Sequence, residues 1–311
     1  MKKNIIADFM LLMVAFVWGT TFIAVQNAID ILPPHSFNAV RFLTASVIIL
    51  ILAFIFDRKN LFNITKEVWI AGFLLGLFLF FGYAFQTLGL LYTSASKAGF
   101  ITGLNVILVP IFATILLKVK PKLTAIIGVS LAAIGLYIMT MIGSTSFSYG
   151  DFLVFLCAIF FALQIVSTGK YAPKYSAFVL AWIQISVVGV LSLIATIIFE
   201  DVGYLTNPDI LLDKDVIIAL LITSVFATAL AFLAQTTFQK HSTPTKVAII
   251  FAMEPVFAAI ASVIYQKEML SINVTIGGSL IFMGMILAEI PSEKITAPFM
   301  RKKDNKIQST T

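Results

Sequence analysis

The chain has 311 residues, of which 60% are apolar and only 12% are charged, whereas a soluble domain usually carries about 25% charged residues. This composition and a mean hydropathy of +1.02 exclude a water-soluble globular enzyme of this size, and the single cysteine excludes an intrachain disulfide. The net charge of +6 would suit a nucleic-acid partner only if the basic residues formed a patch, and their distribution indicates otherwise.

Apolar runs close to 20 residues long follow one another through the chain. A helix of about 20 apolar residues crosses the roughly 30 Å hydrocarbon core of a bilayer. Such a helix also satisfies its backbone hydrogen bonds within the segment, as lipid requires. The sequence therefore predicts an all-α integral membrane protein with ten transmembrane helices, at residues 7–27, 37–56, 68–91, 95–117, 123–142, 150–169, 177–199, 215–239, 244–266 and 270–290.

Lysine and arginine predict the orientation, because they favour cytoplasmic loops. Ten helices place both termini on one side of the membrane. Of the 21 lysines and arginines, 16 fall on that side, two on the other, and three within the predicted helices, namely Arg41, Lys97 and Lys246. We therefore expect both termini in the cytoplasm and no nucleic-acid patch. The lysine- and isoleucine-rich composition favours a bacterial protein, and hence a multi-pass protein of the plasma membrane.

The two halves of the chain resemble each other. The sequence offset that places Gln86 on Gln235 also places Lys97 on Lys246, and a slightly shorter offset near the start of each half places Asp8 on Asp151. Five helices in each half make the second copy enter the membrane upside down, as in many secondary transporters, which bind their solute between the two copies. We predict two inverted five-helix repeats around a central cavity, at 1–145 and 146–291, followed by a basic cytoplasmic tail at 292–311.

Several short motifs follow one another along the chain, namely Trp18–Phe22, Arg41-Phe42, Thr93–Leu104, Val109-Pro110, Ser242–Lys246 and Met253–Ala259. They resemble those of the drug/metabolite transporter superfamily, in particular its EamA-type members. The resemblance covers residues 7–290 and implies a solute carrier, often an exporter of amino acids, related metabolites or toxic compounds, which needs no cofactor. One branch of the superfamily carries sugar phosphates. The second repeat departs from the pattern, because Phe161-Ala162 stands where Trp18-Gly19 stands in the first.

Three basic residues within the predicted helices have two interpretations each. Lys97 and Lys246 occupy equivalent places near the start of a helix in each repeat. They either contact an anionic solute, as the resemblance to the sugar-phosphate branch implies for cationic residues, or extend to lipid headgroups. Arg41 lies near the outer end of its predicted helix, where it faces the cavity mouth or binds lipid headgroups, and the second interpretation is favoured.

Glu254 is the only carboxylate deep within a predicted helix, and it precedes Pro255, which removes a backbone hydrogen bond. It serves either proton coupling or a substrate amine, or else it accepts backbone hydrogen bonds near the bend; the resemblance favours a structural role. Pro110 is a further structural candidate of this kind. Neutral polar and aromatic side chains suit a solute cavity but also suit hydrogen bonds between helices; the candidates are Gln86, Gln235, Trp18, Tyr83, Asn105 and Gln164.

Several glycines are spaced for close contact between helices, as small residues four or seven apart share one helix face. We predict packing contacts for Gly72 and Gly76, Gly99 and Gly103, Gly128 and Gly135, and Gly277 and Gly284.

The sequence therefore predicts a secondary transporter that moves a small metabolite, such as an amino acid or a drug-like compound, by alternating access, in the direction of export. The alternative is an organic-anion or sugar-phosphate exchanger. A membrane enzyme or a channel is least favoured, because both histidines, His35 and His241, lie in or next to loops and no catalytic or metal-ligating cluster appears. The expected partners are the solute and membrane lipid, with the protein a monomer or homodimer.

Overall fold

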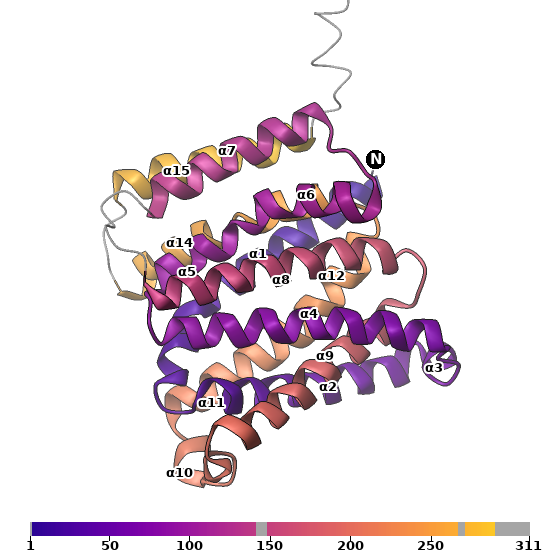
Figure 1. The fold of residues 1–311 in the computed structure, drawn as a ribbon, viewed down its shortest axis with the longest axis vertical. Coiled ribbons are helices and arrows are strands. Elements are labelled where there is room, and N and C mark those ends of the chain that lie inside the picture. Colours follow the sequence, from indigo (N-terminus) through magenta and orange to yellow (C-terminus); the bar gives the residue numbers. More distant parts are fainter. Residues whose placement is uncertain (1, 141–147, 267–270, 290–311) are drawn as a thin grey trace, which may run out of the picture.

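A computed structural model describes residues 2–140, 148–266 and 271–289 of the chain, which contain helices and no strand. The helices lie side by side along one direction (Figure 1). They are α1 (Lys2–Ile29), α2 (Pro34–Phe56), α3 (Arg58–Leu61), α4 (Lys66–Leu90), α5 (Ala95–Gly103), α6 (Asn105–Leu117), α7 (Leu123–Thr140), α8 (Tyr149–Tyr171), α9 (Ala177–Phe199), the 3₁₀ helix η1 (Val202–Leu205), α10 (Pro208–Leu211), α11 (Lys214–Ile222), the π-helix η2 (Thr223–Leu230), α12 (Ala231–Gln239), α13 (Pro244–Phe251), α14 (Glu254–Gln266) and α15 (Ile272–Glu289).

Within the described residues, eight helical stretches are long and apolar enough to cross a membrane: α1, α2, α4, α5–α6, α8, α9, α11–η2–α12 and α13 with the start of α14. The apolar parts of α7 and α15 are shorter, at Leu123–Met139 and Ile272–Ala288. The chain is therefore a multi-pass membrane protein, while the count of ten crossings stays a prediction. The predicted tail at 292–311 lies outside the described residues.

Two predicted helices are each broken into two pieces, at equivalent places in the two halves. Leu104 separates α5 from α6, and Ala252-Met253 separates α13 from α14. Asn105 and Glu254, which the longer of the two sequence offsets relates, are therefore the first residues of α6 and α14. Pro255 lies in the first turn of α14, where its missing N–H leaves no hydrogen bond unmade, whereas Pro110 lies inside α6.

Glycines allow α7 and α15 to lie together at the top of the molecule in Figure 1. A Cβ atom added to Gly128 would lie 2.6 Å from the carbonyl oxygen of Gly284, and one added to Gly135 would lie 2.5 Å from that of Gly277. The predicted packing role of these glycines is confirmed. It is wrong for Gly99, because an added Cβ there would meet no atom of the described residues within 4 Å.

The start of α2 is capped by a side chain from a distant helix end. Glu200, which follows α9, accepts hydrogen bonds of 2.8 Å from the backbone N–H groups of both His35 and Ser36 and one of 2.7 Å from the Ser36 hydroxyl. Since the first N–H groups of a helix have no partner within the helix and carry partial positive charge, a carboxylate is well suited to this place.

Replacing Glu200 by alanine is expected to lower the free energy of unfolding by about 1–3 kcal/mol, because two helix N–H groups lose their acceptor. The thermal unfolding of the purified protein in detergent measures this effect. Asp209→Asn is the control, since Asp209 is an exposed acid in the same stretch between α9 and α11. Equal melting temperatures for Glu200→Ala and wild type would contradict the capping role.

Candidate functional site: a central cavity

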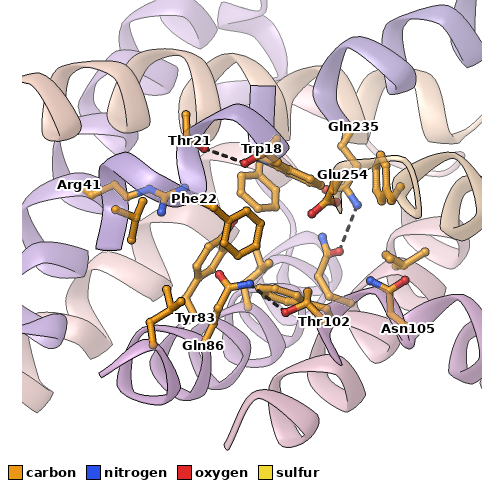
Figure 2. Close-up of a pocket in the computed structure, with 18 residues that line it drawn as sticks. Trp18, Thr21, Phe22, Arg41, Tyr83, Gln86, Thr102, Asn105, Gln235 and Glu254 are labelled. Carbon is orange, nitrogen blue, oxygen red and sulfur yellow. Dashed lines mark hydrogen bonds between the residues drawn. The ribbon is translucent and has the colours of Figure 1, made fainter. Parts of the chain in front are cut away.

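A cavity lies among helices of both halves and contains about 640 Å³ of space between atoms, part of which is open at its mouth. Its walls are aromatic and apolar, with a few amides and two charged side chains, and Figure 2 shows the principal ones. The lining residues are Trp18, Thr21, Phe22, Val25, Arg41, Leu79, Tyr83, Gln86, Leu90, Thr102, Asn105, Phe161, Gln164, Ile165, Phe232, Gln235, Phe251 and Glu254.

Most lining residues form pairs under the two sequence offsets that relate the halves of the chain. Fourteen of the 18 residues belong to seven such pairs, so every lining residue of the second half has its equivalent in the first half, which adds four more. The shorter offset pairs Trp18 with Phe161, Thr21 with Gln164, and Phe22 with Ile165; the longer one pairs Tyr83 with Phe232, Gln86 with Gln235, Thr102 with Phe251, and Asn105 with Glu254.

The structure brings seven of the predicted site residues together in this wall: Trp18, Tyr83, Gln86, Asn105, Gln164, Gln235 and Glu254. Lys97, Lys246, Pro110 and Pro255 are not among the lining residues. The sequence candidates omitted Phe161, Phe232, Thr21 and Phe251. The internal repeat could have identified the first three of these, since they are the partners of Trp18, Tyr83 and Gln164.

Arg41 also lines the cavity, so the favoured prediction that it binds lipid headgroups is wrong. Its side chain is 4% exposed and its guanidinium carbon lies 4.9 Å from the centre of the Tyr83 ring and 5.0 Å from that of Phe42. Its Nε donates a 2.8 Å hydrogen bond to the Thr228 hydroxyl. A buried guanidinium is held in this way by ring faces and a hydroxyl acceptor, and it lies across the cavity from Glu254 (Figure 2).

Buried amides form a hydrogen-bond network beside the cavity. Gln235 Nε2 donates to Gln164 Oε1 at 3.1 Å and to Gln239 Oε1 at 3.3 Å. Gln164 Nε2 donates in turn to the Thr168 hydroxyl at 3.0 Å and to Gln184 Oε1 at 3.3 Å. All four glutamines are at most 2% exposed. Because unpaired buried amides are costly, such a network fixes the side chains that belong to it.

Three side chains of the wall carry oxygens that have no donor in the described part of the protein. Asn105 Oδ1 and Gln235 Oε1 are buried without a hydrogen bond, and no described hydrogen bond or ion pair involves the carboxylate of Glu254, which is partly exposed to the cavity. The three side chains lie on one side of the cavity (Figure 2). This side of the cavity therefore holds buried acceptor oxygens that the described part of the protein leaves without a donor.

Two ion pairs join the halves of the chain outside the cavity wall. Lys97 Nζ lies 2.6 Å from Asp151 Oδ2, and Lys246 Nζ lies 2.7 Å from Asp8 Oδ2. Each lysine is near the start of its helix, after Ser94 or Thr243, whose hydroxyl oxygens accept hydrogen bonds from the lysine backbone N–H groups. Each pair thus connects a helix of one half with a helix of the other.

The two ion pairs differ in their support. Asp151 also accepts hydrogen bonds from the Thr93 hydroxyl at 2.5 Å and from the Ser148 backbone N–H at 2.8 Å, and it is 1% exposed. Asp8 is 16% exposed, and its Oδ1 has no donor among the described residues. The pair at Asp8 is therefore the less strongly held of the two.

Comparison with known proteins supports one family. The sequence pattern of the EamA-like transporter family matches residues 5–141 and again residues 148–289. An uncharacterized transporter of Archaeoglobus fulgidus is 33% identical over 93% of this chain and 87% of its own length. A WAT1-related chloroplast protein of Arabidopsis thaliana is 26% identical over 89% of this chain and 67% of its own length.

Fold similarity agrees with these matches. A solved crystal structure with 18% sequence identity has a TM-score of 0.74 and covers 91% of this chain and 96% of its own; at that identity the likeness concerns the fold. The chain belongs to the EamA-like transporter family.

Proposed function

We propose that this protein is a secondary transporter that exports a small amphipathic metabolite by alternating access, from a central cavity between two inverted five-helix repeats. The observation that carries the proposal is the cavity wall, to which both halves contribute equivalent residues. Two similar halves of opposite orientation can exchange conformations, which exposes the cavity to one side and then to the other. The double match to the family pattern supports the two repeats.

Alternating access needs one contact that closes the cavity toward the outside and another that closes it toward the cytoplasm, and the two ion pairs would supply these contacts. Under the proposed topology, Lys97–Asp151 lies at the outer end of the helices and Lys246–Asp8 at the cytoplasmic end. Lys97 and Lys246 would then be gate residues rather than solute ligands, since each is bound to an aspartate of the other half. The weaker support of Asp8 favours opening toward the cytoplasm, where an exporter loads its solute.

The wall residues would bind the solute: Trp18, Tyr83, Gln86, Asn105, Gln164 and Gln235, with Arg41 at the far side. Glu254 would couple transport to protons or contact the solute. Pro255 would have a structural role at the break between α13 and α14. The protein would act in the plasma membrane with both termini in the cytoplasm.

An organic-anion exchanger is the second candidate, because Arg41 is a cation in the wall itself. Counterflow into proteoliposomes tests both functions. Vesicles loaded with one unlabelled solute are expected to accumulate the same labelled solute, beyond empty vesicles, for at least one class among neutral amino acids, amines, carboxylates and organic phosphates. Accumulation of phosphates or carboxylates alone would favour the second candidate. No accumulation for any class would contradict transport of such solutes.

A further inference from the structure

We propose that the transported solute carries a primary ammonium group on an apolar or aromatic body, and that the ammonium binds between Glu254, Gln235 and Asn105. This inference rests on the proposed function and names its substrate class. It follows from which atoms of the wall lack a hydrogen-bond partner.

The orientation of the Gln235 amide is fixed by its network. At one end, Gln239 Nε2 donates to the Ile165 carbonyl oxygen at 2.6 Å, so Gln239 presents its oxygen to Gln235. The nitrogen of Gln235 must therefore face Gln239, because two amide oxygens cannot share a hydrogen bond.

The other end of the network gives the same orientation. The Thr236 hydroxyl donates to the Phe232 carbonyl oxygen at 2.7 Å, so it can only accept from Gln184 Nε2, at 3.1 Å. Gln184 then presents its oxygen to Gln164, which in turn presents its oxygen to Gln235. Assignments of amide oxygen and nitrogen usually depend on the surrounding network, and here two backbone carbonyls determine it from both ends.

The consequence is that the atom of the Gln235 amide left without a partner is an acceptor, and that no donor of this amide remains for a solute. Both N–H groups of its amide are used by Gln164 and Gln239, while its Oε1 is buried without a partner. Gln235 is 1% exposed and Asn105, whose Oδ1 also lacks a partner, is 5% exposed. Because a buried acceptor without a hydrogen bond destabilises the protein, a donor from the solute would be favoured here.

The carboxylate of Glu254 decides the charge of that donor. It lies on the same side as the two amide oxygens (Figure 2) and faces the cavity without a described partner. An ammonium group has three N–H donors and no acceptor, which matches one carboxylate and two amide oxygens. A carboxylate or phosphate at this place would meet the two amide oxygens and the acidic side chain of Glu254, and would offer none of them a donor.

Aromatic rings next to these acceptors indicate the rest of the solute. The Trp18 ring centre lies 5.2 Å from that of Phe232 and 5.0 Å from that of Phe251. The indole N–H of Trp18 already donates to the Ala227 carbonyl at 2.7 Å, so Trp18 offers the solute a ring face rather than a donor. Ring faces attract a cation and pack against an apolar body.

Three compounds that share a phenylethyl body test this inference: phenethylamine, 2-phenylethanol and 3-phenylpropanoate. Their dissociation constants for the purified protein are measured at pH 7 by isothermal titration calorimetry, in potassium and in sodium buffer. The wild type is expected to bind the amine at least about ten-fold more tightly than the alcohol and the carboxylate. Glu254→Gln and Asn105→Leu should each remove most of this preference, while Glu67→Gln, at an exposed acid outside the cavity, should leave it unchanged.

Equal affinities for the three compounds in the wild type would overturn the inference. A preference for the amine that is seen in potassium buffer but lost in sodium buffer would also overturn it, because the site would then bind sodium. A preference that survives in both cavity variants would also overturn it, because the ammonium would then bind elsewhere. If one cavity variant fails to fold, the other decides. Counterflow of a carboxylate or neutral solute without amine binding would support the transport function and contradict the ammonium site. Amine binding without flux of any solute would support the ammonium site and contradict the transport function.

Discussion

Lys246→Asp is expected to lower counterflow at least about ten-fold, and the exchange Asp8→Lys with Lys246→Asp is expected to restore most of it. In the single variant two carboxylates meet where an ion pair of 2.7 Å stood, so the proposed cytoplasmic gate cannot close. Removing one member of a fully buried pair costs about 3–5 kcal/mol. This pair is 16–18% exposed, so a smaller effect is expected, and about 1.4 kcal/mol is already ten-fold in the gate equilibrium.

Proteoliposome counterflow of one solute gives the measurement, and Lys240→Asp is the matched control. The Lys240→Asp variant makes the same change of charge at an exposed position six residues before Lys246, and it should keep the wild-type rate of counterflow. The double variant tests the interaction itself, because restored flux requires that the two positions meet. A double variant as inactive as the single one would contradict a gate made by this pair.

The same exchange at the other pair should not restore flux. Asp151 also caps α8, where it accepts the Ser148 N–H while the Ser148 hydroxyl accepts from the Asp151 N–H. A lysine at this place would meet the donors of Thr93 and Ser148 and would remove the cap, which contributes about 1 kcal/mol. The two ion pairs therefore join equivalent residues of the two halves, but the aspartate at Asp151 also has a structural role as a helix cap.

The sequence shows that the two halves of the chain are similar, as their separate matches to one family pattern agree, but it does not show how the two halves pack together. The two offsets of the repeat relate Lys97 to Lys246 and Asp8 to Asp151. The ion pairs instead join each lysine to the aspartate of the other half. Equivalence in sequence says which residues play the same part in each copy, whereas contacts between copies depend on how the copies pack, and no local pattern contains that information.

The cavity wall could be predicted where polar residues stand out against apolar sequence. Gln86 and Gln235 are conspicuous in this way, and both line the cavity. Phe161 and Phe232 are not, because phenylalanine is common throughout the chain, with 29 copies. The π-helix η2 lies in a stretch that reads as an ordinary apolar helix. Its backbone is wider than an α-helix, and the Ala227 carbonyl within it accepts the Trp18 N–H, a contact between distant helices.

Gly135→Ala is expected to destabilise the protein by about 1–3 kcal/mol, although alanine is the better helix former by about 1 kcal/mol. The added Cβ would lie 2.5 Å from the Gly277 carbonyl oxygen, 2.9 Å from Ile281 Cγ1 and 3.0 Å from the Ile281 nitrogen. Two of these three atoms belong to the backbone of α15, which cannot move aside as a side chain can. The helices α7 and α15 would have to separate along their contact, which also includes Gly128 and Gly284.

Gly99→Ala makes the matched comparison, because it is the same substitution in a helix where the new methyl group meets open space. Here the better helix propensity of alanine acts alone, so the melting temperature should stay the same or rise, whereas Gly135→Ala should lower it. The opposite signs separate packing from propensity, which a single substitution cannot do. If both variants melted at the wild-type temperature, the glycines of α7 and α15 would not be required for close contact, and the position of α15 against α7 would have to be held by their larger side chains instead.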